Sequence, residues 1–232
     1  MLADADLAKV ANLMDGHRAT MLVALMDGRA LSASDLAARC AISRSLASAH
    51  LSKLLDGGLI AVRPRGRQRQ YRLAGAQVAE VIEAMLGLAP ERTATTLRQA
   101  ARGEAIRQAR TCYDHLAGSL GVALTDALEQ QRVIEPADGS YSLTVAGEQR
   151  LQRFGLDIAA LRGRRRAFAR PCLDWTERRS HLAGALGAGL ADRLLELGWI
   201  RRVPGGRALR LTDAGQRGLR IEFALDHHGT AS

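Results

Sequence analysis

The chain has 232 residues and a formal net charge of +9, from 33 Lys and Arg against 24 Asp and Glu. That excess favours a polyanionic partner, whereas an aromatic content of only 3% disfavours single-strand binding by base stacking. We found no apolar run as long as a membrane span, no signal-peptide pattern at the N-terminus, and only three scattered Cys. We therefore expect a cytoplasmic protein without a membrane partner.

Residues 4–27 predict a helix that is interrupted at Asp15-Gly16, and residues 76–88 predict another. Their apolar positions are Leu7, Val10, Ala11, Met14, Leu22, Val23, Leu25, Met26, Val78, Val81, Ile82 and Met85. This is more apolar surface than one small core needs, which predicts packing against a second copy of the chain. The alternative is that these helices cover the rest of the same chain.

Residues 32–73 predict two short helices, a tight turn between them and an arginine-rich hairpin. Ser32 and Asp35 have the spacing of a capping box, and Ser43 would cap the second helix. The second helix buries Ala47, Leu51, Leu54 and Leu55 and ends at Gly57-Gly58. Strands over 59–63 and 70–73 would flank the cationic tip at 64–69. The pattern predicts a winged helix-turn-helix, because a solvated helical hairpin would mix charges of both signs.

The second helix and the hairpin tip supply the candidate DNA contacts. They are Ser43, Arg44, Ser45, Ser48, His50, Lys53, Arg65, Arg67, Gln68 and Arg69. We expect Arg44, Ser45 and Ser48 to read base edges, and the cations of the wing, with His50 and Lys53, to hold phosphates or the minor groove.

The first 90 residues resemble the ArsR/SmtB family of bacterial winged-helix repressors. The resemblance rests on 15–19 (DGHRA), 25–28 (LMDG), 43–51 (SRSLASAHL), 58–60 (GLI) and the wing ending at 71–73 (YRL). It implies a homodimer on a palindromic double-stranded operator that represses until an inducer binds. The Cys-x-Cys metal motif of the family's arsenic and cadmium sensors is missing, and Cys40 stands alone near that position.

The rest of the chain contains an internal duplication. Residues 109–118 (ARTCYDHLAG) reappear over 169–184 with six extra residues, and 143–147 (LTVAG) reappears as 211–215 (LTDAG). Residues 193–200 also resemble 53–60. The expected fold is mainly α with small β-hairpin wings (α+β): a winged helix-turn-helix followed by two degenerate winged-helix-like units. The expected domains are 1–90 for DNA binding and dimerisation, a linker over 91–104, repeats over 105–155 and 156–226, and a tail over 227–232.

The two later wings differ from the first in charge. The wing at 135–139 is acidic and would repel phosphate, whereas Arg201, Arg202, Arg207 and Arg210 leave the last unit able to touch a DNA backbone. We expect the two repeats to sense an effector or to brace the dimer.

The repeated elements place Cys112, Asp114 and His115 in one copy and Cys172, Asp174 and His181 in the other. These side chains form a donor set for a transition metal ion, and the thiols could also act as redox sensors. Two further hypotheses remain. An organic ligand could bind near Tyr113, Trp175 and Trp199, or the repeated Cys, Asp and His could serve core packing alone and form no site.

We found no Gly-rich phosphate loop, no His-Glu-x-x-His and no Gly-x-Ser-x-Gly elbow, so we expect no enzymatic activity. The sequence predicts a sequence-specific DNA-binding transcriptional regulator: a homodimeric repressor released by an inducer that the C-terminal repeats bind or sense. The alternative is a nucleoid-type or scaffold protein that uses winged helices without a sensed ligand.

Overall fold

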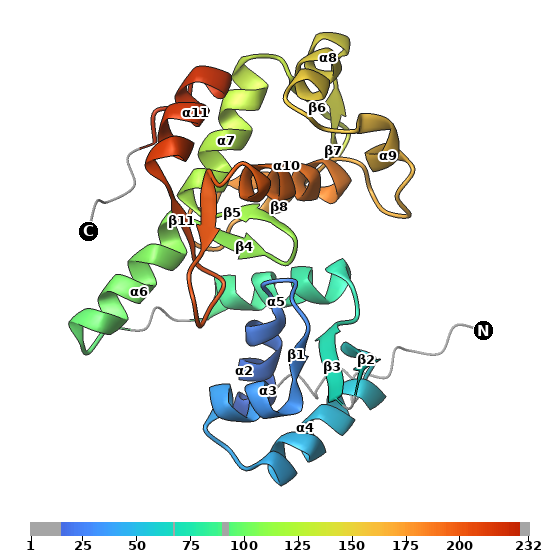
Figure 1. Cartoon of the computed structure of the whole chain (residues 1–232), viewed down its shortest axis with the longest axis vertical. Helices are drawn as coiled ribbons and strands as arrows, with labels where there is room; N and C mark the ends of the chain where they lie inside the picture. Colours follow the sequence, from blue (N-terminus) through green and yellow to red (C-terminus); the bar gives the residue numbers. More distant parts are fainter. Residues whose placement is uncertain (1–14, 67, 90–92, 228–232) are drawn as a thin grey trace. The chain divides into compact units, whose positions relative to one another are not determined.

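The computed structural model describes residues 15–66, 68–89 and 93–227. The chain forms two compact units, residues 1–82 and 83–232 (Figure 1). None of the described helices is long and apolar enough to cross a membrane.

The N-terminal unit has the architecture of a winged helix-turn-helix. Its elements, with α5 running on into the second unit, are α2 (Gly16–Leu25), β1 (Leu31–Ser32), α3 (Ala33–Cys40), α4 (Arg44–Asp56), β2 (Ile60–Arg65), β3 (Gln68–Leu73) and α5 (Ala76–Leu88). The strands form an antiparallel sheet in the order β1-β3-β2. The predicted winged helix-turn-helix is therefore confirmed. The predicted helix over 4–14 lies outside the described residues.

Side chains fix where these helices begin, as the sequence predicted for α3 and α4. The Asp15 carboxylate accepts from the backbone N–H of His17 and of Arg18, both at 3.0 Å, at the start of α2. Ser32 and Asp35 form a capping box on α3, and Ser43 Oγ accepts from Leu46 N at 3.2 Å on α4. These caps hold α3 and α4 at either side of a turn of only a few residues.

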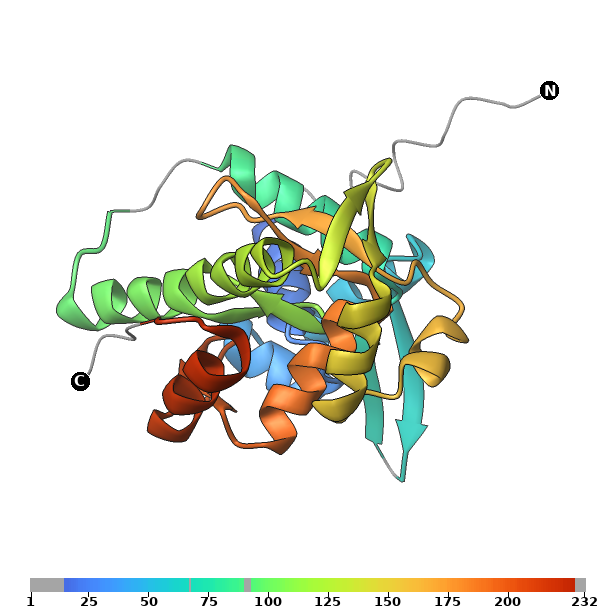
Figure 2. The same cartoon turned by 90° about the horizontal axis from the view of Figure 1, so that it is seen from above.

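The wing is longer than the sequence predicted. Strands β2 and β3 stay in register from Ile60↔Leu73 to Arg65↔Gln68, so that only residues 66 and 67 separate them (Figure 2). The predicted strands stopped at 63 and 70 because Pro64 normally ends a strand. Here β2 is an edge strand, where a residue without an N–H is tolerated. Gly66 supplies the positive φ of +59° that so tight a turn requires.

The C-terminal unit contains the predicted duplication. Helix α6 (Leu97–Gln108) precedes β4 (Arg110–Cys112), β5 (His115–Ala117), α7 (Ser119–Gln130), β6 (Ile134–Ala137), β7 (Ser140–Leu143) and α8 (Val145–Arg153). Helix α9 (Ile158–Arg162) precedes β8 (Arg170–Leu173), β9 (Ser180–Ala183), α10 (Gly184–Glu196), β10 (Ile200–Arg202), β11 (Leu209–Leu211) and α11 (Asp213–Phe223). Each copy is thus hairpin, helix, wing hairpin, helix. In each copy the hairpin stands between a leading helix, α6 or α9, and the helix that precedes the wing.

The predicted division of the chain differs from the observed one in two places. The predicted linker over 91–104 overlaps α6, which begins at Leu97 with Thr96 Oγ1 accepting from Gln99 N. The boundary between units falls inside α5, between Ile82 and Glu83, rather than at residue 90. Glu83 belongs to the second unit because its carboxylate pairs with Arg110 and Arg207.

The two repeats exchange their helices. Helix α7 of the first repeat packs on β9 of the second, and α10 of the second packs on β5 of the first. Backbone hydrogen bonds follow the same exchange: Tyr141 N donates to Ala169 O at 3.1 Å, and Leu209 N donates to Ala109 O at 2.8 Å. One apolar core therefore serves both repeats, and α7 and α10 are largely buried in it.

Glycines allow α7 and α10 to lie close to the strands that precede them, β5 and β9. A Cβ on Gly121 would lie 2.6 Å from Leu116 O, and a Cβ on Gly187 would lie 2.3 Å from Leu182 O. The same two Cβ atoms would lie 3.6 and 3.4 Å from the Cβ atoms of His181 and His115, respectively. Each glycine therefore sits against the histidine of the other repeat.

Candidate functional site

Helix α4 has one buried face and one face of exposed donors. Ala47, Leu51 and Leu54 are buried, whereas Arg44, Ser45, Ser48, Ser52 and Lys53 are exposed. No carboxylate occurs on α4 before Asp56, its last residue. The exposed face thus offers hydroxyl, guanidinium and ammonium donors to an anionic or hydrogen-bond-accepting surface.

His50 is not on this face, which corrects its predicted place among the phosphate contacts. It is 9% exposed, and its Nδ1 lies 3.7 Å from Asp15 Oδ1 at the start of α2. Position 50 follows Ala47 by three residues and precedes Leu54 by four, so helical spacing already puts it on the buried side. Leu55, predicted as core, is only partly buried.

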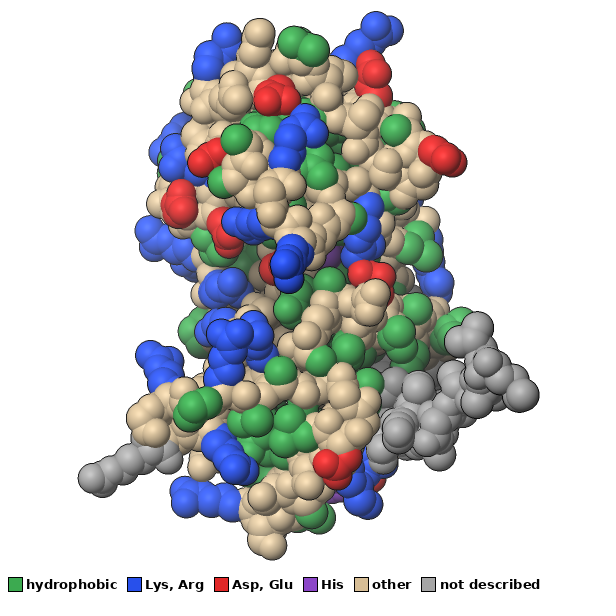
Figure 3. All heavy atoms as spheres, turned by 90° about the vertical axis from the view of Figure 1, so that its right-hand side faces the viewer, with side chains coloured by type: hydrophobic (Ala, Val, Ile, Leu, Met, Phe, Trp, Pro, Cys, Tyr) green, Lys and Arg blue, Asp and Glu red, His purple; other side chains and the backbone are tan. Residues whose placement is uncertain are grey.

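The wing carries its cations into solvent. Arg63, Arg65, Gln68 and Arg69 are exposed, and Arg67 lies outside the described residues. The face of the molecule in Figure 3 also presents more Lys and Arg than Asp and Glu side chains, in keeping with the net charge of +9.

The arginines of the last wing differ in their exposure to solvent. Arg201, Arg202 and Arg210 are exposed. Arg207, predicted to be available to DNA, is only 7% exposed and pairs with Glu83, so it cannot reach a phosphate in this fold.

The duplicated Cys and His side chains meet at one point inside the C-terminal unit. Cys112 and His115 are register partners in the hairpin β4–β5, and Cys172 and His181 are register partners in β8–β9. Cys112 Sγ lies 4.0 Å from Cys172 Sγ, and His115 Nε2 lies 3.2 Å from His181 Nε2. All four residues are buried, and their donor atoms lie within 4.8 Å of one another. We call these four residues the Cys/His cluster.

The two predicted aspartates are near the cluster but outside it. Asp174 Oδ2 lies 3.1 Å from His181 Nδ1, and Asp114 Oδ1 lies 3.3 Å from His115 Nδ1. Each carboxylate stands on the far side of an imidazole, where it orients the ring instead of joining the donor atoms. Sequence spacing alone could not separate these two roles.

Asp174 is also the centre of a buried polar network that sequence reasoning missed. It accepts hydrogen bonds from Arg110 Nη2 at 2.9 Å, from Gly118 N at 2.7 Å and from Thr176 Oγ1 at 2.7 Å. Burial raises the pKa of Asp174, but His181, Arg110 and the other donors outweigh burial and hold that pKa well below its usual range. The carboxylate therefore stays ionised beside His181. Arg110 itself is 0% exposed, and no periodic pattern in the sequence marks it as buried.

The cluster favours negative charge on sulfur. The hydrogen bond from Cys112, and then those from the two imidazoles, lower the pKa of Cys172 in spite of its burial. The same thiol contact, together with burial, raises the pKa of Cys112. The two sulfurs therefore share one proton more readily than they hold two. The thiolate is that of Cys172, and it faces both imidazoles.

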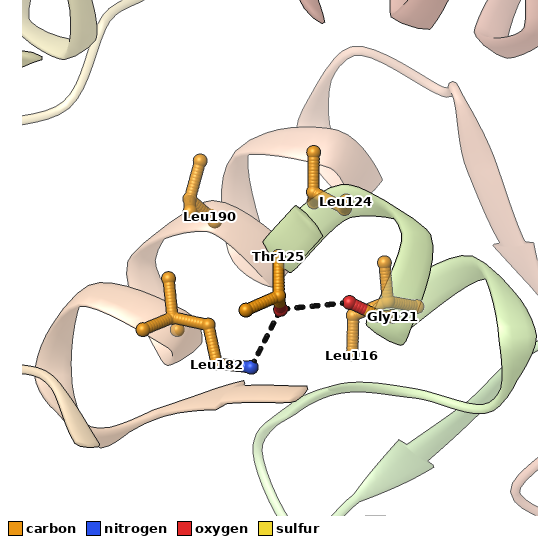
Figure 4. Close-up of a pocket in the computed structure, with 7 residues that line it drawn as sticks. Leu116, Gly121, Leu124, Thr125, Leu182 and Leu190 are labelled. Atoms are coloured by element: carbon orange, nitrogen blue, oxygen red, sulfur yellow. Dashed lines mark hydrogen bonds between the residues drawn. The ribbon is translucent and has the colours of Figure 1, made fainter. Parts of the chain in front are cut away.

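The predicted ligand pocket of Tyr113, Trp175 and Trp199 is not assembled. Trp175 stacks on Arg110, with the guanidinium carbon 5.1 Å from the ring centre, whereas Trp199 packs on Phe154 at 5.5 Å. A cavity at the crossing of the repeats has a volume of about 10 Å³ (Figure 4). Thr125 Oγ1 spans that crossing, accepting from Leu182 N at 2.8 Å and donating to Gly121 O at 2.9 Å. This cavity is too small for an organic effector, whereas a second pocket of the C-terminal unit, lined in part by Leu120, Leu197 and Leu209, has a volume of about 1120 Å³.

Comparisons with known proteins place the chain in a family. A profile described as a helix-turn-helix domain matches residues 13–63. The chain is 42% identical over 212 residues to the uncharacterized HTH-type transcriptional regulator YdfF of Bacillus subtilis (strain 168), covering 91% of this chain and 94% of that protein. It is 37% identical over 98 residues to the HTH-type transcriptional regulator CmtR of Mycobacterium tuberculosis (strain H37Rv), covering 40% of this chain and 81% of that protein.

Among solved structures, the chain is similar to the homodimeric winged helix-turn-helix DNA-binding domain Mb0332 from Mycobacterium bovis. The match has 28% identity and a TM-score of 0.34, and it covers 41% of this chain and 96% of that domain. The match to YdfF extends over both units, so the shared family includes the duplicated C-terminal unit. The chain belongs to the HTH-type transcriptional regulators, DNA-binding proteins, and its N-terminal unit is an ArsR/SmtB-like winged helix-turn-helix.

Proposed function

We propose that the protein is a homodimeric repressor that reads a palindromic operator with α4 and holds the DNA backbone with the wing β2–β3. The observation that carries the proposal is the exposed face of α4. Arg44, Ser45 and Ser48 are exposed on a helix that has no carboxylate before Asp56, and a wing with exposed Arg65 and Arg69 follows along the chain. Arginine and hydroxyl donors on a slim helix suit base edges in the major groove.

The dimer in this proposal is supported by two features. Val81 and Leu88 on α5 are 46% and 86% exposed, although both are large apolar residues. The similar Mb0332 domain is described as homodimeric. A twofold dimer would place two copies of α4 in successive major grooves about 34–36 Å apart, which is why we propose a palindrome.

Wing and helix substitutions should affect binding differently. Arg65→Ala or Arg69→Ala should weaken binding to all duplexes and reduce the slope of log affinity against log salt by roughly one unit. Arg44→Ala or Ser45→Ala should instead reduce the preference for the operator over a scrambled duplex by about 1–3 kcal/mol. Fluorescence anisotropy across a salt series, on the upstream DNA of the chain's own gene, measures both quantities.

Arg217→Ala is the matched control, because Arg217 is an exposed arginine on α11 outside the wing. It should leave the operator preference unchanged. Equal losses on every duplex for both classes of variant would refute the division of roles. A steep salt slope without operator preference would identify a nucleoid-type protein, and the absence of both would identify a scaffold for protein contacts.

We further propose that an inducer releases the operator through the C-terminal unit, with the Cys/His cluster as its sensor. The cluster is the place where four chemically reactive side chains from both repeats meet. An inducer acts only by binding the state with low DNA affinity more tightly, and it needs a few kcal/mol of that difference to empty the operator.

Release from DNA should therefore depend on the two buried thiols. We expect zinc, cadmium, nickel or a mild oxidant to lower the operator affinity of the wild type but not that of the double variant Cys112→Ser/Cys172→Ser. Cys40→Ser, which changes a thiol in the N-terminal unit, is the control and should respond like the wild type. If the wild type and the double variant keep the same affinity under every treatment, the cluster is not the sensor.

A further inference from the structure

The distances inside the Cys/His cluster match those of a tetrahedral metal centre. Coordination at about 2.3 Å for Zn–S and about 2.0 Å for Zn–N separates two sulfurs by about 3.8 Å and two nitrogens by about 3.3 Å. The observed separations are 4.0 Å for the sulfurs and 3.2 Å for the imidazole nitrogens. All four donor atoms also lie within 4.8 Å of one another, as the ligands of a single ion must.

Asp114 and Asp174 orient the two imidazoles of the cluster. His115 Nδ1 lies 3.3 Å from Asp114 Oδ1 and His181 Nδ1 lies 3.1 Å from Asp174 Oδ2, so a carboxylate stands behind each ring on the side away from the other imidazole. The two Nε2 atoms face each other at 3.2 Å, close to the separation of two imidazole ligands of one ion. A carboxylate behind each ligating histidine is the usual outer shell of a zinc site. In this chain a carboxylate stands behind a cluster histidine twice, once in each repeat.

The ligand identities point to the class of ion. Two thiolates and two imidazoles form an S₂N₂ set, which suits Zn²⁺ and its thiophilic divalent analogues Co²⁺ and Cd²⁺ better than Mg²⁺ or Ca²⁺, which prefer oxygen ligands. The four donors come from protein side chains and are buried, so the coordination sphere is closed, as in structural zinc sites.

We propose that Cys112, His115, Cys172 and His181 bind one zinc-class ion that clamps the two repeats together. This deepens the sensing role proposed above, but it stands on geometry within the C-terminal unit and does not require DNA binding. Each repeat supplies one Cys and one His from one hairpin, so the bound ion joins the hairpin β4–β5 to the hairpin β8–β9. Because a metal-binding free energy becomes folding free energy, the ion should stabilise the unit.

The test is metal content, measured on the full-length chain without DNA. Protein prepared under reducing conditions with zinc, then freed of loose metal by gel filtration, should retain about one zinc per chain by elemental mass spectrometry. Replacing zinc with Co²⁺ should give intense visible bands of tetrahedral cobalt together with thiolate-to-metal charge transfer. Cys112→Ser, Cys172→Ser and His181→Asn should each lose both signals, and Cys40→Ser should keep them.

Two further variants separate metal binding from loss of fold. Cys172→His keeps four ligands and should retain zinc with weaker charge-transfer absorption. Asp114→Asn leaves the ligands intact and should weaken zinc affinity about 10–100-fold in competition with a chelator. Asp114 is a positioning residue here, and its side chain is 30% exposed, so its replacement should not unfold the unit.

Several results would overturn the proposal. One is a wild type that retains no more zinc than the double variant Cys112→Ser/Cys172→Ser. Another is a cobalt spectrum without charge transfer, which would exclude thiolate ligands. A third is a Cys112–Cys172 disulfide that forms in air in a protein that takes up no metal when reduced, which would identify a redox pair. A protein that binds zinc but shows no operator preference would refute the proposed function and leave this site standing.

Discussion

Replacing Glu83 with glutamine should destabilise the C-terminal unit by about 3–5 kcal/mol, the usual cost of removing one partner of a buried ion pair. Glu83 is 3% exposed and pairs with Arg207 and, at 3.5 Å, with Arg110. The amide that replaces it would leave Arg207 buried without a countercharge. Both Trp residues of the chain, Trp175 and Trp199, lie in this unit, so urea unfolding followed by tryptophan fluorescence reports on it directly.

Glu104→Gln provides the control, because it is the same chemical change at an exposed position of α6. Its effect should stay within about 0.5 kcal/mol. The double variant Glu83→Gln/Arg207→Met should cost less than the sum of its single changes, since removing both partners leaves no orphan charge on that side. Additive costs would mean that the pair is not energetically coupled.

The sequence predicted the N-terminal unit well because its signals are local. A capping box, a serine cap and a diglycine stop each act within a few residues, and Ser32, Asp35 and Ser43 play the predicted parts. The duplication was also visible, since it needs only a comparison of the chain with itself. The length of the wing was missed because Pro64 breaks a strand in most contexts, and only the sheet order shows that it lies on an edge.

The C-terminal site was only partly predictable, because its geometry is set by contacts between segments some 60 residues apart. The repeated Cys and His could be predicted as site residues from the chemistry of their side chains, and the structure brings all four together. No local pattern indicated that Asp114 and Asp174 would stand behind the imidazoles, or that the repeats would exchange helices. Arg110 and Glu83 were missed because buried charges follow no hydrophobic period.

Gly187→Ala should be among the most damaging single-methyl additions in the chain. Its new Cβ would lie 2.3 Å from the backbone oxygen of Leu182 and 3.4 Å from the Cβ of His115. A backbone oxygen cannot rotate away, so α10 must shift relative to β9, the strand that precedes it. We expect destabilisation at the upper end of about 1–3 kcal/mol for overpacking, and with it a loss of bound zinc, because His115 would be displaced. Urea unfolding and zinc content measure the two effects on one preparation.

Gly103→Ala makes the same substitution in α6, where a Cβ would meet nothing within 4 Å. There the change should stabilise the helix by about 0.5–1 kcal/mol, because alanine loses less backbone entropy than glycine. Opposite signs for the two variants would tie the cost at Gly187 to the contacts of its new Cβ. Gly121→Ala, at the equivalent position, would place its Cβ 2.6 Å from Leu116 O and should likewise destabilise the unit. If alanine at both positions left zinc binding intact, the positions of the two histidines would not depend on the packing of α7 and α10.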